Sequence, residues 1–350
     1  MRRGMAMSDP EGGIAGGLRR LAGEPRVVSR RLPHGRDRRP AGRTGRSFAL
    51  AFRGLATTAT TGAGREPATL GLTLQSCRRE EDATPEGHTI HRLAARHAEL
   101  FGGRRVRASS PQGRFAGGAA RVDGTVLHGT DAYGKHLLHR YDAGTLHVHL
   151  GLYGRFTDGN GTAPPPVGEV RLRLTRRGHW LDLRGPAACE LLDDREGAAL
   201  VARLGADPLR ADADPDRAYE RIRLSDRPLA ALLQDQSILA GPGVIYVTEV
   251  LFRAGLHPTT PGRALDRKTW KTIWDDLRAL MREGVQRGRI DTVHSVHTPE
   301  AMGRPPRVDR HGGEVYVYRR AAQPCLLCGT AVRGGAIAAR NTYWCPTCQP

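Results

Sequence analysis

Residues 90–101 carry the first clear hydrophobic pattern of the chain. Apolar or small side chains recur there every three or four positions, which is the spacing of one face of a helix. The positions on this face are Ile90, Leu93, Ala94, His97, Leu100 and Phe101. Gly102 and Gly103 follow them, and glycine commonly ends a helix. The pattern predicts a short helix that begins shortly after Pro85.

Between residues 124 and 183 the hydrophobic period changes to two. Val170, Leu172 and Leu174 alternate with polar residues, as expected of a strand with one buried face. Turn residues separate strand-like segments at 124–127, 134–141, 146–150, 170–175 and 180–183. These short segments predict the hairpins of a β-sandwich or barrel, with the proline-rich residues 160–167 as a loop between strands.

The helical period returns after residue 200. Residues 229–236 and 245–254 are predicted helices, separated by the glycine-containing turn 240–243. A longer helix follows, and its apolar face indicates core packing rather than a cofactor site. That face consists of Trp270, Ile273, Trp274, Leu277, Leu280 and Met281. Residues 303–313 are predicted to be an exposed basic loop and residues 314–318 a strand.

Residues 1–83 lack such patterns and are rich in Arg, Gly and Ala. Their few apolar runs are isolated, so we expect this leader to be disordered. It could act as a targeting peptide or as an additional DNA-binding tail. A misplaced translation start in the gene model is an equally good explanation.

The chain ends in two Cys-x-x-Cys pairs separated by sixteen residues. Two such pairs can bring four sulfurs around one ion, so we expect a zinc site made of Cys325, Cys328, Cys345 and Cys348. Disulfides are the alternative, but the other cysteines show no pairing pattern and no secretory signal is recognisable. Because sulfur fills all four positions, the zinc would be structural and the chemistry would lie elsewhere.

The charge balance indicates a polyanionic partner. Lys and Arg number 54 against 36 Asp and Glu, a formal net charge of +18. Such a surface attracts phosphates, so nucleic acid is the predicted partner, ahead of an anionic membrane surface. Only three of the basic residues are lysines, Lys135, Lys268 and Lys271, and a GC-rich genome could explain that bias. No apolar run has the length of a membrane span, and we expect an intracellular protein with two domains.

Several histidines offer an alternative site. His88, His91 and His97 lie close in sequence, and His147 and His149 share one face of a predicted strand, so a second metal site is conceivable. Hydrogen-bonded or solvated histidines are the simpler interpretation, because no carboxylate joins them at ligand spacing. The sequence also lacks a Walker-type loop, a dinucleotide fingerprint and a Gly-x-Ser-x-Gly elbow.

Five separated stretches coincide, in order, with one known family. They are Pro-Glu-Gly at 85–87, Gly-Lys-His at 134–136, His-Leu-Gly-Leu-Tyr-Gly at 149–154, Gly-Pro-Gly-Val-Ile-Tyr-Val-Thr-Glu at 241–249, and the cysteine module. On these motifs the chain resembles the formamidopyrimidine-DNA glycosylase/endonuclease VIII family, and within it the endonuclease VIII-like branch of actinobacterial type. The resemblance covers residues 85–349.

The resemblance implies an N-terminal proline as nucleophile, and Pro85 is the matching residue. Its secondary amine would attack C1′ of the damaged nucleotide, displace the base and form an iminium linkage to the sugar. Glu86 matches the acid/base that assists ring opening and proton transfer, and Lys135 matches the residue that acts at the sugar and its phosphate. Arg340 matches the zinc-hairpin arginine that grips the phosphates beside the lesion.

The resemblance also implies the residues that contact DNA. An enzyme of this type rotates the damaged base out of the duplex and fills the gap, and Leu152 and Tyr153 match that wedge. Ordinary packing is the alternative for both residues. Gly243, Val244 and Tyr246 lie in the motif that contacts DNA phosphates in the family.

Two departures from the family pattern bear on activity. Pro85 follows Thr84, and a proline nitrogen within a peptide bond is no nucleophile. No methionine lies between Met7 and Met281, so we expect a non-standard start codon at position 84, proteolytic release of Pro85, or an inactive protein. Val244 occupies the position of a phosphate-binding asparagine, so we expect weaker DNA binding.

The resemblance implies an α+β fold. It would comprise an N-terminal helix with a two-sheet β-sandwich in residues 85–200, a helical domain with a helix-two-turns-helix motif in 205–305, and a four-cysteine zinc-finger hairpin in 314–350. The implied activity is that of a monomeric, bacterial, nucleoid-associated glycosylase and abasic-site lyase of base excision repair. Its substrate would be duplex DNA with an oxidised base, more often a pyrimidine, or an abasic site.

Two other functions remain open. A catalytically inactive DNA-binding protein of the same fold would explain Thr84 and Val244. A zinc-ribbon RNA-binding protein would explain the charge and the cysteines, but not the motifs at residues 85–87 and 134–136. One elimination or two, the preferred lesion and the opposite base are not determined by the sequence.

Overall fold

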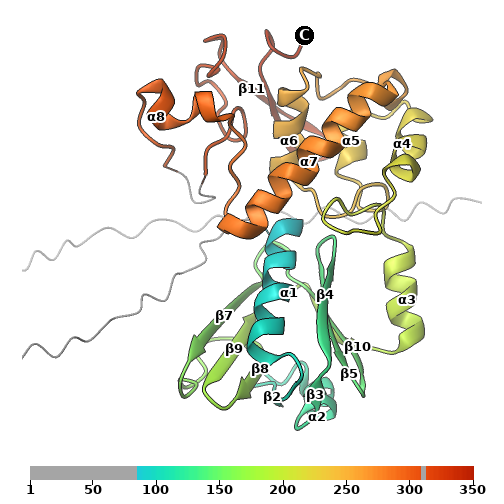
Figure 1. Ribbon diagram of the computed structural model, residues 1–350, viewed down its shortest axis with the longest axis vertical. Coiled ribbons are helices and arrows are strands. Elements are labelled where there is room, and N and C mark those ends of the chain that lie inside the picture. Colours follow the sequence, from blue (N-terminus) through green and yellow to red (C-terminus); the bar gives the residue numbers. More distant parts are fainter. Residues whose placement is uncertain (1–84, 309–312) are drawn as a thin grey trace, which may run out of the picture. The chain divides into compact units, whose positions relative to one another are not determined.

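Helix α1, Gly87–Phe101, begins two residues after Pro85 and buries the predicted face. It lies along strands β4 and β5, and it also contacts helix α7 (Figure 1). The computed structural model describes residues 85–308 and 313–350, so the prediction for residues 1–83 lies outside the described residues. None of the described helices is long and apolar enough to cross a membrane.

Two four-stranded antiparallel sheets follow α1, in the orders β10-β6-β5-β4 and β2-β8-β9-β7. Leucines from both sheets, among them Leu137 and Leu172, share one buried core with the apolar face of α1. The predicted β-sandwich is therefore confirmed. The strands are β2 Arg107–Ser109, β4 Gly129–Tyr133, β5 His136–Tyr141, β6 Gly144–His149, β7 Arg155–Asn160, β8 Val170–Arg176, β9 His179–Arg184 and β10 Ala188–Leu192. The small strands β1 Arg104–Arg105 and β3 Val126–Leu127 pair with each other, and α2 spans Ala116–Val122.

The second half of the chain is helical, as predicted. Its helices are α3 Asp194–Ala202, α4 Pro215–Arg223, α5 Leu229–Leu233, α6 Val244–Arg253, α7 Arg267–Arg287 and α8 Pro299–Met302, with short 3-10 turns at Gly262–Ala264 and Ser295–His297. The predicted apolar face of α7 is buried throughout. Helix α5 ends earlier than predicted, because the Asp235 carboxylate accepts bonds from the backbone N–H and the hydroxyl of Ser237 and forms a turn there.

The predicted strand at residues 314–318 is wrong. No strand is assigned there, although Val315, Tyr316, Val317 and Tyr318 are all buried. The backbone N–H groups of residues 316 to 318 donate to the carboxylate of Glu249 on α6 instead of to a neighbouring strand. The uninterrupted apolar run at residues 315–318 thus correctly indicated that these side chains are buried. It did not indicate the backbone conformation correctly.

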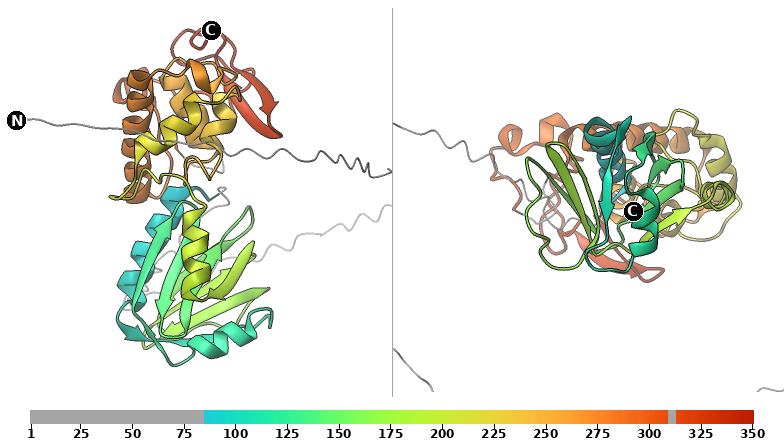
Figure 2. Two further views of the ribbon diagram at one scale, coloured as in Figure 1. Left: turned by 90° about the vertical axis from the view of Figure 1, so that its right-hand side faces the viewer. Right: turned by 90° about the horizontal axis from the view of Figure 1, so that it is seen from below.

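The chain ends in a hairpin of β11, Arg333–Ile337, and β12, Arg340–Trp344. Ala338 and Ala339 form its turn with φ values of 49° and 60°, as a two-residue type I′ hairpin turn requires. Figure 2 shows this hairpin projecting from the helical part of the chain.

Two histidines form a buried pair between α1 and β5. Nδ1 of His97 lies 3.0 Å from Nε2 of His139, and both side chains are buried. Burial lowers the pKa of His139 to about 4 and the pKa of His97 well below its ordinary value, with the neighbouring His139 as the second cause for His97. Both imidazoles are therefore neutral in the folded protein at neutral pH.

The free energy of unfolding should fall as the pH drops from about 6.5 towards about 4. Between these pH values His97 and His139 bind protons in the unfolded chain but not in the folded protein. The stability present above pH 6.5 is therefore lost on acidification. For His139 alone the loss should reach about 3 kcal/mol. Urea unfolding at several pH values measures the slope, and His139→Gln should flatten it. His128→Gln, at the surface, is the control. If His139→Gln showed the same dependence of the unfolding free energy on pH as this control, the lowered pKa of His139 would be contradicted.

Candidate active site at the start of helix α6

The carboxylate of Glu86 binds the first turn of α6. Its Oε2 accepts from the backbone N–H of Gly243 at 2.7 Å, and its Oε1 accepts from the N–H of Ile245 at 2.9 Å. The first N–H groups of a helix have no partner within the helix and carry partial positive charge, so a carboxylate is well suited to them. Glu86 itself is the residue directly before α1. One buried carboxylate therefore fixes the start of α1 against the start of α6.

Glycines make this close approach possible. The N–H of Gly87 donates to the carbonyl of Gly241 at 2.9 Å, and a Cβ on Gly87 would lie 2.8 Å from Gly241 Cα. A Cβ on Gly243 would lie 2.6 Å from Cδ of Glu86 and 2.7 Å from Nζ of Lys135. Gly243 is buried, and its lack of a side chain leaves room for Glu86 and Lys135.

Lys135 therefore lies beside Glu86. It follows the turn at Gly134 and directly precedes β5. Burial raises the pKa of Glu86, although Lys135 and the backbone N–H groups of α6 act in the opposite direction. Burial likewise lowers the pKa of Lys135, opposed by Glu86 and reinforced by the charge of Arg340. Both shifts favour the neutral forms, so the pair can exchange protons closer to neutral pH than the free side chains.

Arg340 reaches the same region from the hairpin. It is the first residue of β12, and its Nη1 donates to the carbonyl of Gln234 at 2.9 Å. Its charge contributes to the lowered pKa of Lys135. The structure thus brings three of the four predicted catalytic residues together, and half-buried Pro85 directly precedes Glu86.

Asp207 was missed by the sequence analysis. Its buried carboxylate accepts from the N–H of Gly134 at 2.7 Å and from Nε2 of His91 at 2.8 Å. It also accepts from the N–H of Leu209 two residues on. This carboxylate therefore anchors the turn before Lys135 to α1. In the sequence Asp207 is marked only as an acidic residue within an otherwise apolar stretch. That pattern does not predict which groups its carboxylate binds.

The predicted wedge residues are exposed. Leu152 and Tyr153 lie in the turn after β6 and are 69% and 83% exposed. A Cβ on the neighbouring Gly154 would come within 2.2 Å of the Leu150 carbonyl, so the turn is tight. Two adjacent exposed apolar side chains on a tight turn are unusual for packing residues and fit a contact surface.

Val244 and Tyr246 differ in their exposure. Val244 is half-buried at the first position of α6, where its side chain packs against the helical core. Tyr246 is 0% exposed, so its side chain packs in the helical core. The helical period places Tyr246 on the inner face of α6, between His88 and Gly284.

His91 and His147 form hydrogen bonds, and no group of histidines in the described part of the chain is arranged to hold a metal ion. Nε2 of His91 pairs with Asp207, while Nδ1 of His147 lies 2.9 Å from Glu190 and its Nε2 lies 2.8 Å from His136. Within the described residues, the only cluster of His, Cys, Asp or Glu side chains arranged to hold a metal is that of the four cysteines.

The four cysteine sulfurs lie within 4.8 Å of one another. Sγ atoms of Cys328 and Cys345 are 3.4 Å apart and those of Cys325 and Cys348 are 3.9 Å apart. Tetrahedral zinc with Zn–S bonds of about 2.3 Å requires separations of roughly 3.8 Å. The donor set and its spacing therefore fit a single zinc ion.

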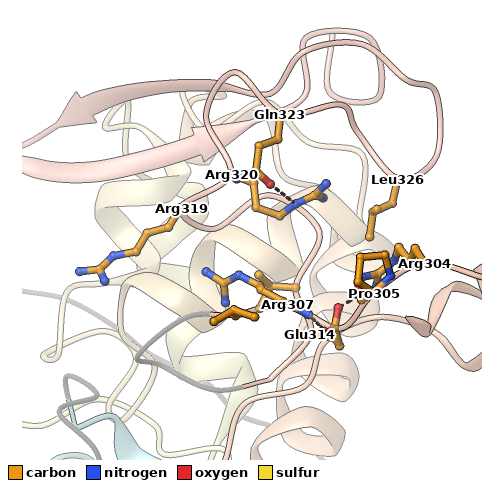
Figure 3. A pocket seen from close by; sticks show the side chains of 10 residues that line it. Arg304, Pro305, Arg307, Glu314, Arg319, Arg320, Gln323 and Leu326 are labelled. Carbon is orange, nitrogen blue, oxygen red and sulfur yellow. Dashed lines mark hydrogen bonds and ion pairs between the residues drawn. The ribbon is translucent and has the colours of Figure 1, made fainter. Parts of the chain in front are cut away.

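A basic pocket of about 260 Å³ lies between the loop at residues 304–308 and the segment that leads into the cysteine module (Figure 3). Arg304, Arg307, Arg319 and Arg320 line it together with Glu314. Arg304 forms an ion pair with Glu314 at 2.8 Å, and Arg320 donates to the carbonyls of residues 316 and 324. The pocket adds to the positive charge of this part of the protein.

Family models match three parts of the chain. The formamidopyrimidine-DNA glycosylase N-terminal domain matches residues 84–189, the H2TH domain of the same glycosylase matches 204–295, and the zinc finger found in FPG and IleRS matches 322–350. The last match, with the sulfur geometry, confirms one structural zinc ion held by the four cysteines.

Individual relatives agree with these matches. Endonuclease 8 1 of Mycobacterium tuberculosis is 47% identical over 273 residues, 76% of this chain and 99% of the relative. The DNA-(apurinic or apyrimidinic site) lyase Nei2 of Mycolicibacterium smegmatis is 32% identical over 76% of this chain and 98% of its own length. The crystal structure of MutM (Fpg) from Thermus thermophilus superposes with a TM-score of 0.59 at 30% identity, covering 76% of this chain and 98% of that chain. The α+β fold, the zinc module and these similarities establish that the chain belongs to the formamidopyrimidine-DNA glycosylase/endonuclease VIII family.

Proposed function

We propose that this chain is a bifunctional DNA glycosylase and abasic-site lyase of base excision repair. The observation that carries the proposal is that Glu86, the residue after Pro85, meets Lys135 at the first turn of α6, where the charge of Arg340 also acts on Lys135. Similarity to Endonuclease 8 1 and to an abasic-site lyase supports the same activity. The substrate would be duplex DNA in the bacterial cell, bound by a monomer.

In the proposed reaction the amine of Pro85 attacks C1′ of the damaged nucleotide, and the bond from C1′ to the base breaks. Glu86, whose pKa is raised by burial, would give a proton to the sugar ring oxygen as the ring opens. The resulting iminium acidifies C2′, and loss of that proton expels the 3′ phosphate and cuts the strand. An N-terminal amine of pKa about 7.7 to 8.0 is partly neutral at neutral pH, as the attack requires.

The remaining residues would act on the DNA itself. Arg340 would hold the phosphates beside the reacting sugar as a cation, and Lys135 would act at the sugar and its phosphate. Leu152 and Tyr153 would enter the duplex where the base leaves it. Oxidised pyrimidines are the proposed substrates, because the motifs and the 47% identical relative belong to the endonuclease VIII branch. The proposed domains are the β-sandwich domain at residues 85–200, the helical domain at 205–305 and the zinc finger at 314–350.

An inactive DNA-binding protein of the same fold is the second candidate. In the printed sequence the nitrogen of Pro85 is bonded to Thr84, and Val244 has no donor for a phosphate. Both candidates bind DNA, but only the first forms a covalent bond to it.

Borohydride trapping on abasic-site DNA separates the two candidates. A gene with its start codon directly before Pro85 gives a chain whose proline amine is free after removal of the methionine. This chain should form a covalent adduct with the DNA, whereas Pro85→Gly should lower adduct formation at least tenfold and the full chain should form none unless it is processed. Absence of an adduct from the shortened chain, despite DNA binding, would leave the binding function.

Val244→Asn should strengthen binding to an abasic-site duplex. The amide restores a donor to a charged phosphate, worth about 1.5 to 3 kcal/mol, or roughly tenfold or more in Kd. Val244→Ala is the matched control, because it also removes apolar volume but supplies no donor. Equal affinities of the two variants would mean that residue 244 does not meet a phosphate.

Tyr153→Ala should reduce base excision with little change in stability. The side chain is 83% exposed, so the unfolding free energy should change by less than about 0.5 kcal/mol. Excision from duplex DNA should slow at least tenfold, because the extruded base would no longer be replaced in the stack. The rate with Tyr153→Phe should stay near that of the original chain. A Tyr153→Ala variant with unimpaired excision would assign the wedge to other residues.

A further inference from the structure

Glu249 is a completely buried carboxylate that the proposed chemistry does not use. It lies on α6, six residues after Gly243, and is 0% exposed. Buried carboxylates are costly unless several donors satisfy them, so the position of its partners is informative.

Within the described residues, the hydrogen-bond partners of Glu249 come from segments that follow α7. Its Oε1 accepts from the N–H groups of Val317 at 2.9 Å and Tyr318 at 2.8 Å. Its Oε2 accepts from the N–H of Tyr316 at 2.7 Å and from the hydroxyl of Thr292 at 2.6 Å. Three consecutive N–H groups thus converge on one anion, an arrangement that carboxylates and phosphates satisfy and neutral amides do not.

The anchored segment contacts the hairpin that carries Arg340. The ring of Tyr318 packs edge-on against Tyr343 at 5.5 Å, and Tyr343 lies three residues after Arg340 on β12. The ring of Tyr316 stacks on Phe252 of α6 at 4.7 Å. A continuous path of contacts therefore leads from Glu249 through Tyr318 and Tyr343 to the strand of Arg340.

The same helix holds Glu86 at its first turn. Helix α6 therefore bears two carboxylate contacts, one to the segment before α1 and one to the segment before the zinc module. Glu314, Arg319 and Arg320, which flank residues 316–318 in sequence, line the basic pocket (Figure 3).

We propose that Glu249 is a positioning residue, whose carboxylate sets the place of Arg340 relative to Glu86 and Lys135 by binding the N–H groups of residues 316–318. Arg340 can hold a phosphate beside the reacting sugar only while β12 keeps its position against α6. In Glu249→Gln an NH₂ group replaces one of the two carboxylate oxygens. This group is a donor only, so it cannot accept a hydrogen bond from the backbone N–H groups that it faces. The inference rests on the proposed role of Arg340 in DNA binding, but not on catalysis.

A double-mutant cycle on the full chain tests the proposal. Affinity for a duplex with a tetrahydrofuran abasic-site analogue is measured for the original chain, Glu249→Gln, Arg340→Ala and the double variant. Each single substitution should weaken binding about tenfold, and the double variant should be no more than about twofold weaker than Arg340→Ala. Glu283→Gln is the control, since this carboxylate pairs with Arg287 at the surface of α7 and should leave the affinity unchanged.

Zinc content and thermal unfolding are measured for the same proteins. If Glu249→Gln does not fold, Tyr343→Leu takes its place in the cycle, because it keeps apolar volume and removes the ring contact to Tyr318. Additive effects of the two substitutions, with zinc retained, would overturn the proposal, as would unchanged affinity in Arg340→Ala. A failure of borohydride trapping by the shortened chain would instead count against the proposed catalysis and leave this cycle intact.

Discussion

The contact between the Glu86 carboxylate and the first turn of α6 determines the site. It brings the start of α1, and with it Pro85, to a helix more than 150 positions later in the chain, since Gly243 follows Glu86 by 157 residues. The glycines at 87, 241 and 243 leave the space that this approach needs. Without the carboxylate, two N–H groups at the start of a buried helix would lose their acceptor, and the residues before α1 would lose their anchor.

The same contact determines the electrostatics. Helix N–H groups and Lys135 stabilise the charged form of Glu86, but burial opposes them more strongly, and the net effect raises its pKa. Lys135 is affected in the opposite direction, because burial and the nearby Arg340 both disfavour its charge. A carboxyl that can hold a proton beside an amine that can lose one is the pairing that proton transfer at a sugar requires. Asp207 and Glu249 are more remote, and they act on the backbone that carries Lys135 and on the segment that meets the strand of Arg340.

The sequence predicted what local patterns and motifs record. The helical period of the hydrophobic residues predicted the buried faces of α1 and α7, and the spacing of the cysteines predicted the zinc site. The family resemblance identified Glu86, Lys135 and Arg340. The partners of Asp207 and Glu249 could not be predicted, because a lone acidic residue in an apolar stretch does not reveal which distant N–H groups it binds. The wrong strand at 314–318 has the same origin: apolar patterns record burial, whereas long-range contacts such as those to Glu249 decide backbone geometry.

Glu86 is buried against α6, and this burial should make it hold its proton more strongly than a free carboxyl group does. Carbon-13 NMR of the glutamate carboxyl groups, with the Glu86 signal identified by its absence in Glu86→Gln, measures that proton directly. The Glu86 signal should titrate with a pKa above the ordinary value of 4.5. A pKa at or below 4.5 would show a solvated or ion-paired carboxylate and would contradict the dominance of burial at Glu86.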